Sequence, residues 1–271
     1  MKNQLKWSLV LSMGLLLNGS CQKDPTSTEF EIPSEEVSTF NHDFSKYIGD
    51  PRVQACRVVN LNPKTDERAA AENRTLWQNG QTVTVSFMGG SEYVRSRVIA
   101  YAKQWEEFAN IKFEFVQSNG MIRVAFIQGA GAYSHMGRNA LGVPANQETM
   151  NFGWFDDNTS EAEFSRTTLH EFGHALGLIH EHQHPEVELD WDREFTYQYY
   201  AGAPNYWSRQ QVDVNLLNTY TTAQTTFNAY DETSIMHYPI LGRLVNRSND
   251  TPDNTVLSAG DKQLVGTIYP F

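Results

Sequence analysis

The sequence predicts a folded, soluble body that contains both strands and helices. Apolar residues alternate, as in strands, over residues 82–87, 112–116 and 121–127, recur at helical spacing between the first two of these segments, and lose regular pattern after Gly177. The 271 residues are 40% hydrophobic and 20% charged, which excludes wholesale disorder and a multi-span membrane protein. This length allows one large domain behind a removable front end.

The first 21 residues have the features of an export signal. Lys2 and Lys6 precede an apolar run, residues 7–17, which ends in small and polar residues before Cys21. This run is too short for a bilayer core of about 30 Å, which needs ~20 helical residues, so a permanent transmembrane helix is the weaker alternative. We therefore expect an exported protein.

Cys21 closes a segment, residues 17–21, that resembles the cleavage box of bacterial lipoproteins, in which the cysteine becomes the lipidated first residue. Asn18 departs from the aliphatic residue usual at its position. The resemblance favours a lipid anchor at Cys21, and thus a bacterial envelope lipoprotein, over ordinary cleavage and a secreted protein. A lipidated Cys21 leaves Cys56 without a cysteine partner for a disulfide.

The following residues, 22–68, are expected to form a tether and pro-segment, and residues 69–271 the folded domain. Residues 22–45 are rich in Ser, Thr, Glu, Asp and Pro, a composition that does not easily form a core. The formal net charge of the chain is -11, and no cluster of Lys and Arg interrupts the acidic residues. Binding to phosphate backbones needs such a cluster, so we expect no nucleic-acid partner.

The elements follow in order from the first strand at 82–87. Apolar residues at helical spacing over 94–108 predict an amphipathic helix after Ser91, and two more strands are expected at 112–116 and 121–127.

A second helix is expected from residue 161 to Gly177. Ser160, with Glu163 three residues later, forms a capping-box pattern before apolar residues at helical spacing. Beyond Gly177 the chain is aromatic, polar and irregular until Ser258 and Asp261, which can cap a last helix.

Residues 170–180 read HEFGHALGLIH, the pattern of a metal site. His170 and His174 are four residues apart, so on a helix they share one face, about 6 Å apart along the axis, where both can bind one ion. Zinc prefers tetrahedral geometry with nitrogen ligands at ~2.0–2.1 Å, and His180 is the candidate third ligand. Gly177 can adopt the left-handed conformation that ends the helix and turns the chain towards the ion.

Glu171, directly after the first histidine, is the candidate general base. Three neutral histidines leave a zinc ion its charge and an open position, which lowers the pKa of bound water from 15.7 towards ~7. A carboxylate within reach can take the proton and pass it to a leaving amine. A purely structural zinc site would close the fourth position with protein ligands and give Glu171 no role. His182 and His184 exceed the three ligands required, so we expect them at the surface or in support of the ligands.

Two motifs make the chain similar to the astacin family of metzincin zinc metalloproteases, bacterial type. The first runs from His170 to Glu181, because the family places glutamate after the third histidine. The second runs from Ser234 to Tyr238 and resembles the methionine turn and its tyrosine. Weaker matches extend across most of residues 70–270. The resemblance implies an α+β, zincin-like catalytic domain with a mixed β-sheet, an active-site helix and an irregular lower half.

The resemblance also implies a zinc-dependent endopeptidase that binds a protein or peptide substrate in extended form, with residues 134–138 near the edge strand that holds it. Met236 would form a hydrophobic floor under the zinc. Tyr238 would ligate zinc at rest and swing to donate to the oxyanion. Glu181 would bind the freed N-terminus of the mature enzyme, for which Arg68 offers an activation cut.

Two residues of the pro-segment are candidates for keeping a precursor latent. A Cys56 thiolate is a strong zinc ligand that could exclude water until the segment is cut, and we favour it. Asp50 is the alternative, because Tyr47 to Asp50 resembles the aspartate switch of astacin pro-segments with Tyr in place of Phe. A buried, inert Cys56 is the third option.

Two rival functions are weighed against the peptidase. A binding module that keeps the zinc fold without turnover would be favoured by loss of Glu171 or Tyr238, and both are present. A different zincin with a downstream glutamate ligand is disfavoured by Gly177 and His180. The sequence leaves the cleavage preference open, with residues 243 and 247, both arginines after the methionine turn, as candidates for selecting acidic side chains.

Overall fold

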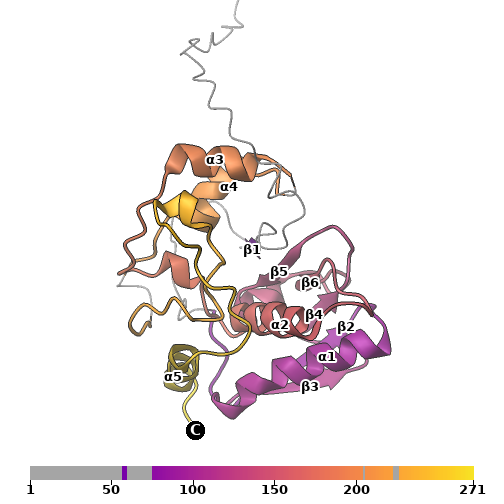
Figure 1. Cartoon of the computed structure of the whole chain (residues 1–271). Helices are drawn as coiled ribbons and strands as arrows, with labels where there is room; N and C mark the ends of the chain where they lie inside the picture. The colour runs from indigo at the N-terminus through magenta and orange to yellow at the C-terminus, as the bar shows by residue number, and fades with distance from the viewer. Residues whose placement is uncertain (1–56, 60–74, 204, 222–225) are drawn as a thin grey trace, which may run out of the picture. The chain divides into compact units, whose positions relative to one another are not determined.

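The computed structural model describes residues 57–59, 75–203, 205–221 and 226–271 (Figure 1). The predicted export signal and most of the predicted tether and pro-segment lie outside the described residues, and with them Cys21, Asp50, Cys56 and Arg68. Within the described part of the chain, no helix is long and apolar enough to span a bilayer.

The centre of the fold is a mixed sheet of six strands in the order β1-β5-β6-β4-β2-β3. Strand β5 runs antiparallel to β6, and the other neighbouring pairs are parallel. The mixed sheet confirms the predicted α+β class. The strands are β1 (Arg57–Val59), β2 (Thr82–Phe87), β3 (Lys112–Val116), β4 (Ile122–Ala125), β5 (Ala132–His135) and β6 (Met150–Phe152).

Two helices pack with the sheet in one hydrophobic core, α1 (Glu92–Ala102) and α2 (Glu161–Ala175). Helix α1 begins where predicted, with the Ser91 side chain accepting a hydrogen bond from the backbone of Val94. It continues as a 3-10 helix, η3 (Lys103–Glu107). The ring of Phe172 in α2 meets Phe113 in β3 edge-on at 5.0 Å, which fixes α2 against the sheet.

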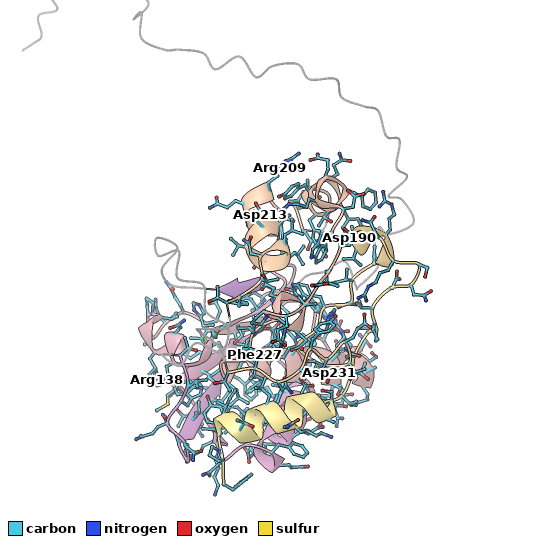
Figure 2. The ribbon with its side chains drawn as sticks, turned by 90° about the vertical axis from the view of Figure 1, so that its left-hand side faces the viewer. Arg138, Asp190, Arg209, Asp213, Phe227 and Asp231 are labelled. Atoms are coloured by element: carbon cyan, nitrogen blue, oxygen red, sulfur yellow. The ribbon has the colours of Figure 1, made fainter. Side chains whose placement is uncertain are left out.

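The chain after Gly177 is less regular, as predicted, but it holds helices that the sequence did not predict. Helix α3 (Arg193–Ala201) is followed by α4 (Arg209–Val212) and the π-helix η6 (Asp213–Leu217), the segment that carries the labelled Arg209 and Asp213 in Figure 2. A second core of aromatic and aliphatic residues buries their inner faces. Short 3-10 turns complete the fold, at η4 (Gly137–Gly142), η5 (Glu181–Gln183) and η7 (Gly242–Val245).

The last helix, α5 (Ala259–Ile268), has the predicted cap. Ser258 and Asp261 form a full capping box, each bonding the backbone N–H of the other. The hydroxyl of Tyr269 then donates to the carbonyl of Leu176 at 2.7 Å, so the end of the chain is tied to the end of the active-site helix.

Candidate metal centre

Helix α2 and the turn after it bring three histidines together. The helix ends at Ala175, and Gly177 has a φ of +94° in the left-handed region, as expected. The Gly177 N–H donates to the carbonyl of His174 at 2.8 Å and the Leu178 N–H to that of Gly173 at 2.9 Å, the pair of bonds of a Schellman turn. This turn reverses the chain and returns His180 to the helix.

The nitrogens of His170, His174 and His180 lie within 4.8 Å of one another, and all three residues are buried. The Nε2 atoms of His174 and His180 are 3.0 Å apart. Two nitrogens on one tetrahedral ion at ~2.0–2.1 Å would be roughly 3.4 Å apart, so a small adjustment accommodates a zinc ion. The set therefore fits one zinc.

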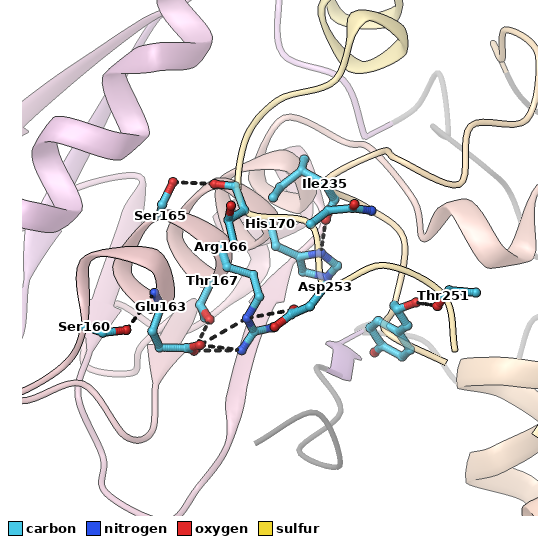
Figure 3. A network of polar contacts seen from close by, with 12 residues as sticks. Ser160, Glu163, Ser165, Arg166, Thr167, His170, Ile235, Thr251 and Asp253 are labelled. Carbon is cyan, nitrogen blue, oxygen red and sulfur yellow. Dashed lines mark hydrogen bonds and ion pairs between the residues drawn. The ribbon is translucent and has the colours of Figure 1, made fainter. Parts of the chain in front are cut away.

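Backbone carbonyls orient two of these rings. The Nδ1 atom of His170 lies 2.8 Å from the carbonyl of Ile235 (Figure 3), and the Nδ1 of His174 lies 2.8 Å from the carbonyl of Leu178. A carbonyl only accepts, so both Nδ1 atoms carry hydrogen and both Nε2 lone pairs are available to a metal. Burial lowers the pKa of His174 to about 4 and holds the pKa values of His170 and His180 well below the usual range, which keeps the rings neutral.

Glu171 is fully buried beside the ligands. It lines a pocket together with His170, Tyr238, Trp154 and Tyr200, so its carboxylate and the first ligand face the same space. The candidate base and the candidate donor therefore share one pocket.

Met236 packs against α2 between two of the ligands, with 2% of its surface exposed. A Cβ on Gly173 would overlap the Met236 sulfur, so the glycine makes room for the methionine against the helix. Asp261 of α5 fixes the methionine turn. Its carboxylate accepts hydrogen bonds from the hydroxyl of Ser234 at 2.6 Å and from the Ile235 N–H at 2.8 Å.

The backbone of Tyr238 is fixed by two neighbours. Its carbonyl accepts from the Thr251 hydroxyl at 2.9 Å and lies 2.6 Å from Nδ1 of His237, whose Nε2 is 2.8 Å from the hydroxyl of Tyr230. The Tyr238 ring lies 4.3 Å from the ring of His180.

Glu181, the residue after the third ligand, is buried and accepts a hydrogen bond from the Asp231 N–H at 2.8 Å. Burial is the main cause that raises the pKa of this carboxyl to about 7; the bond from the Asp231 N–H opposes the shift, and the nearby carboxyls of Asp261 and Asp231 add to it. The site is therefore suited to a positively charged partner.

Of the two positions expected for His182 and His184, at the surface or in support of the ligands, the surface is excluded, because the residues are 0% and 2% exposed. The Nε2 of His182 donates to the carbonyl of Asn215 at 3.0 Å, and the Nε2 of His184 to that of Asn228 at 2.8 Å. Neither belongs to the three-histidine cluster, as expected. Both acceptors are more than 30 residues away along the chain, so no local pattern could indicate them.

The arginines suggested for the pocket lie elsewhere. Arg243 pairs with Asp192 at 2.9 Å, and Arg247 pairs with Glu232. The cation that lines the pocket is Arg166, which binds Glu163 through two nitrogens and lies 3.6 Å from Asp253 (Figure 3). Sequence reasoning missed Arg166, although its position one helical turn before His170 was the available signal.

A helix and a tight turn that present three buried, neutral histidines beside a mixed sheet define a zinc metalloprotease type of domain. The family model described as Astacin, a peptidase family, matches residues 69–266. The chain belongs to this family.

Individual relatives agree with the family match. The structure titled "Structure of myroilysin" is 55% identical, with a TM-score of 0.72, and the match covers 75% of this chain and 99% of that one. Protein SpAN of Strongylocentrotus purpuratus is 27% identical over 68% of this chain and 29% of its own length. Zinc metalloproteinase nas-36 of Caenorhabditis elegans is 29% identical over 59% of this chain and 22% of its own length. The chain thus spans less than a third of these two curated relatives.

Proposed function

We propose that the chain is a zinc-dependent endopeptidase that hydrolyses protein or peptide bonds. The observation that carries the proposal is the group of three buried, neutral histidines with the buried carboxylate of Glu171 on the same pocket. His170, His174 and His180 would hold the ion. Zinc supplies Lewis-acid chemistry, which makes water acidic enough to lose a proton near neutral pH.

Glu171 accepts the proton of the attacking water and delivers it to the leaving amine. The Tyr238 hydroxyl donates to the oxygen that becomes negative in the tetrahedral transition state. Met236 supports the ligands from below through its contact with Gly173. The names of the zinc metalloproteinases among the relatives support this chemistry.

An extended substrate would add to the sheet at β5. Substrates of this kind pair their main chain with an exposed strand edge. Strand β5 contains Ser134 and His135 of the segment expected to bind substrate, and β6 occupies one of its edges. The other edge pairs in parallel with β1, from Arg57↔Tyr133 to Val59↔His135.

That pairing supports synthesis as a latent precursor, because β1 belongs to the predicted pro-segment, residues 22–68. While β1 is paired, a substrate has no access to the outer edge of β5, and cleavage at Arg68 would allow β1 to leave. Cys56 directly precedes β1 and lies outside the described residues, as does Asp50. One of these two would block the zinc in the precursor, and we favour Cys56.

Latency can be tested in a precursor whose cleavage at Arg68 is blocked. Cys56→Ser and Asp50→Asn are made separately, and cleavage of a peptide is assayed. Premature activity of the first variant alone supports the thiolate, and of the second alone the carboxylate. Latent behaviour of both variants would assign latency to the pairing of β1 with β5 and would contradict the claim that either residue alone keeps the precursor latent.

Cleavage at Arg68 would also free an N-terminus for Glu181. The buried carboxylate of Glu181 would then gain a positive partner, which offsets the cost of burying its charge. The export signal at residues 1–21 would deliver the protein to the bacterial envelope, as a lipoprotein anchored at Cys21 or as a secreted protein.

A random peptide library tests the proposed activity. Activated protein should cleave the library, lose this activity with a zinc chelator and regain it when zinc is added back. Binding of peptides without any cleavage by zinc-loaded protein would favour the binding module instead.

A further inference from the structure

We propose that His182 is a positioning residue, which holds the ring of Tyr238 beside the metal ligands. The proposal rests on the proposed role of Tyr238 as a transition-state donor. His182 is buried, lies outside the ligand cluster and has no role in the chemistry proposed above.

The ring of Tyr238 lies in a notch between His180 and His182. Its centroid is 4.3 Å from that of His180 and 4.5 Å from that of His182, and the planes of Tyr238 and His182 are only 27° apart. The two histidine rings are 5.1 Å apart. One wall of the notch is thus the ligand His180 and the other is His182, while the ring of His170 lies further off, at 5.9 Å from that of Tyr238.

His182 is itself held firmly by the π-helix η6. Its Nε2 donates to the carbonyl of Asn215 at 3.0 Å. The next residue, Gln183, donates to the carbonyls of Val214 and Asn218 at 2.9 and 2.8 Å. Both side chains therefore tie η5 to η6, and they fix the flat face of His182 that stacks on Tyr238.

The contact matters because the bonds at its carbonyl fix the backbone of Tyr238, and the stack with His182 contributes to the direction of its ring. Thr251 and His237 bind the carbonyl. Without the His182 ring, one wall of the notch is lost, and the phenol could turn into the vacated space and away from the position in which it donates. Misplacement of this donor in part of the molecules should lower kcat roughly two- to tenfold, less than the loss of the donor itself.

Four variants separate this role from a structural one. His182→Ala removes the ring and the hydrogen bond, His182→Phe keeps the ring, and His182→Gln keeps an amide donor without the ring. His184→Ala is the matched control, because His184 is equally buried but contacts Phe227 and Tyr230 instead of Tyr238. For each variant, the zinc content and the kcat and KM for one peptide are measured.

We expect His182→Ala and His182→Gln to lower kcat two- to tenfold with zinc content and KM unchanged. His182→Phe should restore kcat to within about twofold, and His184→Ala should leave kcat within about twofold of the parent. In a Tyr238→Phe background, His182→Ala should have no further effect, because the two residues act as one unit.

The positioning role would be overturned if the losses of kcat caused by His182→Ala and by Tyr238→Phe multiplied in the double variant. It would also be overturned by a His182→Phe variant as slow as His182→Ala, since the bond to Asn215 would then be the part that matters, or by loss of zinc from His182→Phe. A wild-type protein that cleaves no peptide when activated and zinc-loaded would instead contradict the proposed function itself.

Discussion

Gly173 and Met236 are in such close contact that the site has no room for a Cβ at residue 173. That Cβ would overlap the Met236 sulfur and would lie 3.3 Å from the ring of Trp105. The glycine lies between His170 and His174 on the helix, and the methionine follows the turn that begins at Ser234. One contact therefore connects the two motifs on which the family resemblance depends.

Gly173→Ala is predicted to destabilise the protein. Alanine in a helix usually stabilises by ~1 kcal/mol over glycine, but overpacking a buried contact costs about 1–3 kcal/mol. We expect the difference, a net loss of up to roughly 2 kcal/mol, by denaturant unfolding of the zinc-loaded protein. Adding Met236→Ala should make the double variant lose less than the sum of the single losses. Unchanged stability of Gly173→Ala would show that the contact is not as tight as described.

Tyr238→Phe should lower kcat and leave KM nearly unchanged. A donor used mainly in the transition state contributes little to binding of the ground state, and removal of one such donor costs on the order of 10²–10³ in rate. Steady-state kinetics with one peptide measures both constants. A change in KM alone would mean that Tyr238 only packs against substrate.

Arg166→Met should shift the side-chain preference of the pocket. Arg166 supplies the positive charge among the residues that line it, partly offset by Glu163 and Asp253. Its removal should reduce kcat/KM for peptides with Asp or Glu next to the scissile bond relative to the same peptides with Ala. Arg243→Met is the matched control, since Arg243 is not in the pocket lining. Equal preferences in Arg166→Met and the parent would exclude Arg166 from specificity.

His135→Gln should make stability less sensitive to acid. Burial, and then the charge of Arg123, lower the pKa of His135, whereas Glu148 opposes the shift. Between the usual value of 6.5 and the lower folded value, the unfolded chain binds a proton that the folded chain does not, so stability is full above 6.5 and falls as the pH drops below it. The slope is at most ~1.4 kcal/mol per pH unit for one proton.

Unfolding of zinc-loaded parent and variant at about pH 7.5 and about pH 5.5, on either side of the usual histidine pKa, measures this difference. The variant should lose less stability than the parent between the two values. An equal or greater loss in the variant would show that His135 does not titrate on unfolding in this range.

Local patterns predicted the helices that begin at a capping residue and the strand with alternating apolar residues. The caps at Ser91, Ser160 and Ser258 start helices where expected, and the alternation over 82–87 forms β2. The spacing of His170, His174 and His180 predicted their meeting, because a helix face and one glycine turn are local geometry.

Contacts between residues far apart in the sequence could not be predicted from local patterns. Nothing local indicates that Arg57–Val59 pairs with β5, or that Asp261, visible as a cap, also holds the methionine turn. Buried His182 donates to the carbonyl of Asn215, which lies in a π-helix, and no sequence pattern predicts that π-helix. Helix α3 was missed because its few turns are aromatic and depend on tertiary packing.

Glu171→Gln tests the central claim most directly, measured as zinc content and peptide hydrolysis on the same activated sample. The three histidines remain, so the variant should bind one zinc per chain, while loss of the general base should lower kcat by at least roughly 10²–10⁴-fold. His174→Ala, which removes a ligand, should lose both zinc and activity. A Glu171→Gln variant that holds zinc and cleaves peptide at a rate near that of the parent would contradict the account.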